Sequence, residues 1–303
     1  MLRSPVTVPV SAVHGLLSGA YAQGLATPAW TAGVLEAAGI APERLAQSGA
    51  RVTAAQCVAL FSVLVETLGD ECLGQLSRPL RRGSLALVAR STLGAPSLAV
   101  AMRRAANSFS LRQDDVVLAC AHEPVLSGIT LVVPDASRAS QNFLHELPLR
   151  VFWRLLVWLQ GGRLVPRRFD FSVKQPAYGA DYARIFPAPL RFGQSHSGVW
   201  FDAAALATRV RRDAVALQAF LHAKPGNLVG PHLVGPHLVE QATSARVRAL
   251  LHRASPDWPD LVSTAARLHM SVSALHRHLA AEATSFQTFK DQLHRDLAIV
   301  RLN

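Results

Sequence analysis

Cysteine is scarce in this chain, and its spacing limits the chemistry that the protein can support. The three cysteines, Cys57, Cys72 and Cys120, are odd in number, far apart and without a CxxC pair. A disulfide framework or a zinc site is therefore not expected, and this cysteine usage fits a reducing cytoplasm best. We expect neither a metal nor a cofactor.

Long apolar runs and catalytic motifs are also missing from the sequence. No apolar run reaches the roughly 18 residues of a membrane span, and Pro5 and Pro9 interrupt the N-terminus where a signal-peptide core would lie. There is no GxSxG, GxxxxGK[ST], HExxH or GxGxxG sequence. We predict a cytoplasmic protein that has no membrane partner, no catalytic residues and no enzyme activity.

The charge of the chain is strongly positive. Its 303 residues are 50% hydrophobic and 17% charged, with a net charge of +11. Such a balance is typical of proteins with a polyanionic partner such as nucleic acid. Only three of the 31 basic residues are lysine, however, and a GC-rich genome produces the same bias toward arginine, so both interpretations stay open at this point.

Residues 1–223 show alternating helical and strand patterns. Short helical patterns occupy 10–46, and Val58, Phe61 and Leu68 recur at helical spacing between a candidate N-cap at Thr53 and a terminating Gly69. Pro148 is expected to kink or divide the longest helix. Further helices are expected at 97–106, 137–160, 178–185 and 213–221, and strands at 116–120, 128–133, 168–173 and 189–192, the first two as a hairpin.

Residues 224–237 mark the clearest boundary. The pentapeptide LVGPH occurs twice in succession, at 228–232 and 233–237, and the repeated Gly-Pro steps exclude a regular helix or central strand. Duplication explains the paired histidines His232 and His237 better than metal binding does. We predict an α+β protein with a mixed α/β ligand-sensing and dimerisation domain at 1–223, a linker at 224–237 and an all-α segment at 238–303.

Within the all-α segment, helices are expected at 238–252, 260–268, 271–281 and 285–302. Ser271 stands where an N-cap is expected, and Val272, Leu275 and Leu279 then share one face that Leu261, Ala265 and Leu268 can cover. The opposite face is short and polar and carries Arg277. An apolar back and a small polar front are what a helix needs to enter the major groove of DNA. An ordinary amphipathic helix pair has the same spacing.

This segment resembles the AraC/XylS family of transcription regulators. The likeness rests on Ala265, Leu268, Met270-Ser271, Leu275, Arg277, Leu279, Ala281-Glu282 and Thr284-Ser285-Phe286, and it continues at Leu297-Ala298 and Leu302. Upstream, segments at 83–92, 96–101 and 166–202 are similar to the arabinose-binding-type N-terminal domain of one branch of that family. The resemblance implies a ligand-responsive DNA-binding regulator whose DNA contacts come from Ser271, Ser273, His276 and Arg277.

The sequence departs from the family pattern in several places. The family has two helix-turn-helix units, whereas the second is not found between residue 285 and Asn303. His269 and Ala283 stand where the family has Gly, and His294 stands where it has Arg. Gly tolerates a positive φ better than His or Ala does. We therefore expect DNA binding to be weak or to depend on a homodimer.

Two functions remain open from the sequence. The first is a ligand-responsive regulator with DNA and a small-molecule effector as partners. The second is a truncated ligand-binding or dimerisation module with little DNA affinity. The second draws support from residues 241–303, which hold eight basic and five acidic residues and so carry only +3 of the net +11. The effector is unknown, and a pocket is expected among the β-segments around 115–133 and 164–201, with these candidate lining residues, each of which could equally be structural: Arg103, His145, Trp153, Arg168 and Tyr182.

Overall fold

The computed structural model describes residues 7–47, 49–162, 164–176, 182–222, 247, 250–251, 254, 257–281, 285–288 and 290–291. The chain divides into two compact units, one of residues 8–235 and one of residues 236–303 together with 1–7. We refer to them as the large unit and the small unit. The predicted linker at 224–237 lies outside the described residues.

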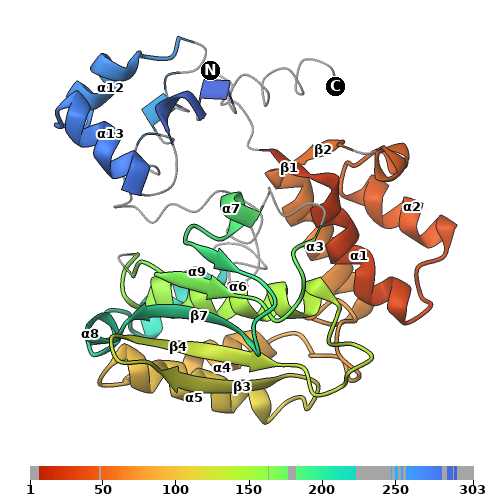
Figure 1. Ribbon diagram of the computed structural model, residues 1–303. Helices are drawn as coiled ribbons and strands as arrows, with labels where there is room; N and C mark the ends of the chain where they lie inside the picture. The colour runs from red at the N-terminus through yellow and green to blue at the C-terminus, as the bar shows by residue number, and fades with distance from the viewer. Residues whose placement is uncertain are drawn as a thin grey trace. The chain divides into compact units, whose positions relative to one another are not determined.

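The large unit is built on a five-stranded sheet (Figure 1). In spatial order the strands are β3 (Val117–His122), β4 (Leu126–Val132), β7 (Ser197–Asp202), β5 (Arg168–Asp170) and β6 (Leu190–Arg191). The β3–β4, β4–β7 and β5–β7 pairs are antiparallel, and β5–β6 is parallel. The predicted hairpin is thus confirmed, and the fold is α+β.

Helices cover one face of this sheet and extend beyond it (Figure 1). Helix α5 (Leu98–Ser110) packs on β3, while α6 (Asn142–Leu159) packs on β4 and β7. The remaining elements of the large unit are β1 (Thr7–Pro9), α1 (Val10–Ala22), α2 (Pro28–Ala37), η1 (Pro42–Ala46), β2 (Arg51–Thr53), α3 (Ala54–Leu68), α4 (Ser84–Ser91), α7 (Tyr182–Ile185), α8 (Ala203–Leu206) and α9 (Ala214–His222). Strands β1 and β2 form a separate two-stranded sheet.

Local sequence signals account for several helix ends. Thr53 and Gln56 form the reciprocal capping box of α3, and Gly69 ends that helix with φ 64°. Ser97 caps α5 by accepting a hydrogen bond from the Val100 amide. Pro148 neither divides nor ends α6, which is one helix, although it begins at Asn142 rather than at residue 137.

The central strand β7 and helix α4 have no counterpart among the predicted elements. Every residue of β7 from Ser197 to Phe201 is buried, so the strand lacks the apolar–polar alternation that marks a half-exposed strand. Strand β5 also ends at Asp170, earlier than the predicted 173. The all-helical segment is partly described as α12 (Leu261–Arg267) and α13 (Val272–Ala281), and most of the predicted helices at 238–252 and 285–302 lies outside the described residues.

Helix α1 lies so close to the turn at residues 73–75 that it needs a glycine there. A Cβ added to Gly19 would clash with the backbone carbonyl oxygen of Leu73, and no flexible side chain is involved that could move away. Gly33 in α2 is the natural comparison, because it is also helical but exposed, with nothing within 4 Å of an added Cβ.

We predict opposite effects for the same substitution at these two glycines. Gly19→Ala should lower the free energy of unfolding by about 1–3 kcal/mol because of overpacking. Gly33→Ala should raise it by about 0.4–1 kcal/mol because alanine restricts the unfolded chain and favours the helix. Urea denaturation of the full chain measures both, and a Gly19→Ala variant as stable as Gly33→Ala would contradict the close approach.

Candidate nucleic-acid interface and ligand cavity

The helix pair of the small unit is defined at both N-termini by side-chain caps. Asp260 accepts a hydrogen bond from the Ser263 amide at 2.7 Å and begins α12. Ser271 Oγ accepts one from the Ala274 amide at 3.1 Å and begins α13. The hydrogen bond from Ser263 is the main reason that the pKa of the Asp260 carboxyl lies below its usual value. The predicted cap at Ser271 is confirmed.

An apolar core joins the two helices. Ala265 of α12 and Leu268, which directly follows that helix, pack with Leu275 and Leu279 of α13. Leu261 and Val272 are partly buried against this core. These are the residues whose spacing predicted a shared face. The opposite face of α13 is therefore the one that is free to meet a partner.

All four predicted DNA-contacting residues lie on the exposed surface of this unit. Ser271, Ser273, His276 and Arg277 are exposed, while Leu275 between them is fully buried. Arg277 is exposed and forms no ion pair with another described residue, and a guanidinium can bind a base edge or a phosphate. The side chain of His278, and Ala283 and His294, lie outside what the structure describes.

The turn between the helices carries a backbone constraint. His269 has φ 56°, in the left-handed region that glycine adopts without steric cost. A side chain with a Cβ costs about 1–2 kcal/mol in this conformation. The expected unfavourable histidine in the turn is therefore confirmed, and the helix pair forms in spite of it.

We predict that His269→Gly stabilises the small unit. The free energy of local opening should rise by about 0.5–1 kcal/mol, because relief of the left-handed backbone exceeds the entropy that glycine loses. Hydrogen exchange of the α12 and α13 amides in the full chain measures this. Ala266→Gly, at an exposed position inside α12, is the control and should lower protection by about 1 kcal/mol; a similar loss in His269→Gly would argue against strain at the turn.

The five candidate lining residues of the large unit do not converge on one pocket. Arg103 is exposed on α5. Arg168 lies over the Trp200 ring at 4.7 Å and pairs with Glu123 at 2.6 Å. The other three, His145, Trp153 and Tyr182, are buried within the fold and have structural partners.

Trp153 and Tyr182 belong to a cluster of aromatic side chains between α6, α7 and the sheet. The Trp153 ring meets Phe169 at 5.2 Å, and Phe169 in turn meets Phe186 at 5.0 Å. Tyr182 and Phe186 both pack on Phe171. Their rings pack against one another, so Trp153 and Tyr182 contribute to the core of the large unit.

A buried ion pair connects this cluster to a small cavity. Arg150 and Glu146, one turn apart on α6, meet at 3.0 Å with side chains only 6% and 5% exposed. The Tyr182 hydroxyl donates a hydrogen bond to Glu146, and the Arg150 guanidinium lies 5.2 Å from the centre of the Phe186 ring. A carboxylate and a guanidinium one helical turn apart, in the sequence HELPLR of a mostly apolar helix, are the sequence signal for this pair, which was not predicted.

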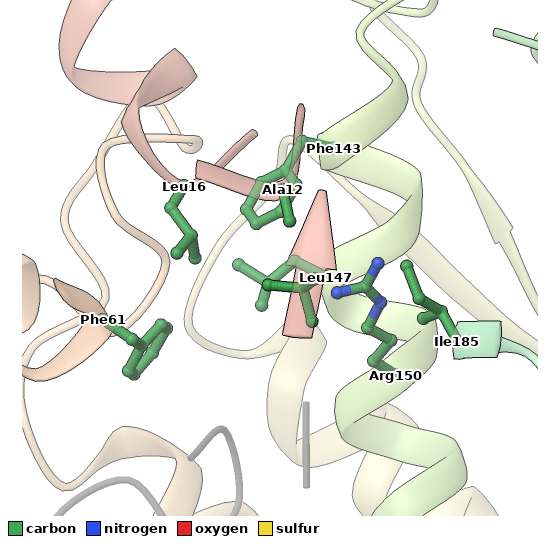
Figure 2. A pocket seen from close by; sticks show the side chains of 8 residues that line it. Ala12, Leu16, Phe61, Phe143, Leu147, Arg150 and Ile185 are labelled. Carbon is green, nitrogen blue, oxygen red and sulfur yellow. The ribbon is translucent and has the colours of Figure 1, made fainter. Parts of the chain in front are cut away.

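The cavity itself is small and mostly apolar (Figure 2). Arg150 shares its wall with Ala12 and Leu16 of α1 and with other apolar side chains, Val8, Phe61, Phe143, Leu147 and Ile185. Its volume is about 10 Å³, which is room for about one water molecule. In this conformation the cavity does not hold a small-molecule effector.

The described residues contain no cluster of three or more metal-binding side chains and no helix long and apolar enough to cross a bilayer. The three cysteines are free thiols, and two of them, Cys57 and Cys72, are buried.

Comparison with known proteins places the large unit in a family. A family model described as the N-terminal arabinose-binding domain of AraC transcription regulators matches residues 31–210, more than half of the chain. The chain belongs to the AraC family of transcription regulators. The match runs from within α2 to beyond α8 and so includes the five-stranded sheet, the aromatic cluster and the buried ion pair.

Two Pseudomonas aeruginosa proteins are similar to this AraC-family chain. The ornithine utilization regulator is 26% identical over 161 residues, which are 53% of this chain and 46% of that protein, so the aligned region spans about half of the relative. The crystal structure of the transcriptional regulator CdpR aligns with 94% of this chain and 84% of its own at 16% identity and a TM-score of 0.35.

His145 connects α6 to the sheet of the AraC-family domain. Its Nε2 lies 2.9 Å from the Ala139 carbonyl oxygen, and its Nδ1 lies 2.9 Å from Ser197 Oγ on β7. A neutral imidazole serves both contacts by donating to the carbonyl and accepting from the hydroxyl. Burial lowers the pKa of His145 below its usual 6.5, and the hydrogen bond to Ala139 opposes this only in part.

We predict that His145 makes the domain sensitive to acid. Below pH 6.5 the unfolded chain takes up the proton before the folded one does, so the free energy of unfolding falls as the pH decreases through this range. His145→Gln should reduce that slope between about pH 7.5 and about pH 5.5 in urea denaturation. His14→Gln, which removes an exposed histidine, is the control, and an equal change of slope in both variants would contradict the assignment.

Proposed function

We propose that this AraC-family chain is a ligand-responsive transcription regulator that binds DNA through α13. Ser271, Ser273, His276 and Arg277 make the contacts. Ser273 and Arg277 read base edges, His276 contacts a base or a phosphate, and Ser271 begins the helix. The exposed polar face of α13, backed by buried Leu275 and Leu279, is the observation that carries the proposal.

The shape and chemistry of this face support the assignment. Serine side chains are short and let the helix approach the groove closely, and arginine can bond a guanine edge through two hydrogen bonds. Asp260 and Ser271 fix where the two helices begin, so the Arg277 side chain starts from a defined backbone position. Defined placement of the contacting side chains is what specific readout requires.

We further propose that two copies of the chain act together. The described part of the small unit contains one helix-turn-helix, which alone contacts one major-groove site. A homodimer would present two such helices to two half-sites and add their contacts. Binding by a single copy would then be weak.

We predict that Arg277→Ala weakens DNA binding at least about tenfold, the size expected for one lost base or phosphate contact. Gel-shift titration on the chain's own upstream region, at two salt concentrations, measures the loss. Arg90→Ala is the charge-matched control, because Arg90 is exposed on α4 in the large unit.

Two results would count against the proposal. Absence of salt-sensitive binding by the wild-type chain would favour the alternative function, a ligand-binding or dimerisation module with little DNA affinity. An equal loss in Arg277→Ala and Arg90→Ala would mean that binding depends on total charge and not on α13.

The name of the ornithine utilization regulator suggests an amino-acid effector, and the description of the family model suggests a sugar. We propose only that this chain's effector is a small molecule recognised by the large unit. The charge of the side chains at the surface of that unit limits which class of small molecule can bind there.

A further inference from the structure

A second hollow in the large unit is large enough for a small molecule. It lies at the segment before α4 and has a volume of about 640 Å³, compared with about 10 Å³ for the apolar cavity beside Arg150. Small-molecule sites usually have about 300–1,000 Å³. Of the two, this hollow is the one with room for an effector.

Four arginines line this hollow: Arg78, Arg81, Arg82 and Arg112. Arg78 pairs with Asp114 at 2.5 Å, but both side chains are well exposed, 66% and 86%, and such a pair contributes little. Within the described ranges, Arg81, Arg82 and Arg112 form no ion pair. Among the described residues, the hollow therefore presents three guanidinium groups that are not engaged in an ion pair.

The carboxylates that lie near the hollow are already engaged with the backbone. Glu71 accepts hydrogen bonds from the Gly83 and Leu85 amides at 2.6 and 2.8 Å. Asp115 accepts from the Ser77 amide at 2.9 Å and pairs with Arg138 at 2.6 Å. Neither carboxylate forms an ion pair with an arginine of the hollow, although burial raises the pKa of Glu71 and the charge of Arg82 is close enough to oppose that rise.

Hydrogen bonds to a buried carboxylate fix the backbone that leads to the arginines. The Asp70 carboxylate, 2% exposed, accepts hydrogen bonds from three backbone amides, those of Cys72, Gly74 and Leu80, at 2.7 to 2.9 Å. Asp70 and Arg81 also form an isolated β-bridge. Because the backbone is fixed, little ordering is needed before the guanidinium groups can bind a ligand.

The distribution of charge agrees with a site in the large unit. Residues 241–303 carry only +3 of the net +11, so most of the excess positive charge lies outside the helix-turn-helix segment. The hollow is a place where part of that excess is concentrated. Guanidinium groups bind carboxylates and phosphates through paired hydrogen bonds.

We propose that this hollow binds a small anion with at least two negative charges, phosphate or carboxylate, and that this anion is the effector. The assignment of the anion as the effector rests on the proposed function, whereas the anion-binding site itself does not. The hollow is open to solvent, and its four arginines come from only two short parts of the chain. Such a compact charge cluster favours a small anion over the extended backbone of DNA. The same charge disfavours ornithine, whose side chain is a cation, so this chain's effector differs from the one suggested by the relative's name.

The binding test uses pyrophosphate and citrate as probes, with ornithine and arabinose for comparison, in isothermal titration of the full chain. We expect both anions to bind, with affinity that falls as salt is raised, and ornithine and arabinose not to bind at this site. The Arg81→Gln/Arg82→Gln double variant should lose at least tenfold in affinity for the anions. Arg90→Gln, an exposed arginine at the far end of α4, should stay within twofold of the wild type.

The melting temperatures of the variants without ligand show whether they fold. Arg112→Gln is a second variant that removes a guanidinium of the same hollow from a different part of the chain. The site is overturned if neither anion binds, or if Arg90→Gln loses as much affinity as the double variant. It is also overturned if the double variant weakens DNA binding while anion binding is unchanged, because the arginines would then contact DNA.

The effector half is tested separately by gel shift with and without the tighter-binding anion. A change in DNA affinity of at least fivefold in the wild type, absent in the double variant, is expected. Anion binding without such a change overturns the effector assignment and leaves the site standing. Absence of DNA binding in any condition contradicts the proposed function and not the anion site.

Discussion

The burial of α6 is the constraint on which the rest of the large unit depends. Fifteen of its 18 residues are buried, because the helix packs on β4 and β7 and also contacts α1 and α5. A helix buried on nearly every side cannot keep its polar groups in water, so each must find a partner inside the protein. His145 is hydrogen-bonded to Ser197 and to the Ala139 carbonyl. Arg150 forms an ion pair with Glu146 and lies over the Phe186 ring.

This packing has a consequence for recognition. Aromatic rings and the Glu146–Arg150 pair pack around α6, and the cavity beside that pair has space for about one water. Removing one partner of a buried pair leaves an uncompensated charge at a cost of several kcal/mol, so the pair is best understood as part of the structure. Both surfaces to which we assign binding are instead exposed and supported from behind by buried side chains, Asp70 at the hollow and Leu275 at α13.

Sequence patterns predicted those elements whose signals are local. The cap at Thr53, the helix that begins after Ser97 and the hairpin β3–β4 were all predicted from residues within a few positions of one another. The same is true of α12 and α13, where Asp260, Ser271 and the apolar spacing define the pair. Strand β7 was not predictable in this way, because a strand buried on both faces has no alternation, and its place at the centre of the sheet depends on partners far away in the chain.

Local sequence was enough to predict the helix pair, its exposed polar face and the unfavourable residue in its turn, because caps, periodicity and the need for a positive φ act over a few residues. Which buried groups contact one another depends on the packing of the whole domain. Whether His145, Trp153 and Tyr182 line a pocket or fill the core depends on what packs against them, and the fold places them in the core. It also brings Arg112 to the hollow of Arg78, Arg81 and Arg82, because contacts between distant segments are fixed by the packing of whole elements and not by local sequence.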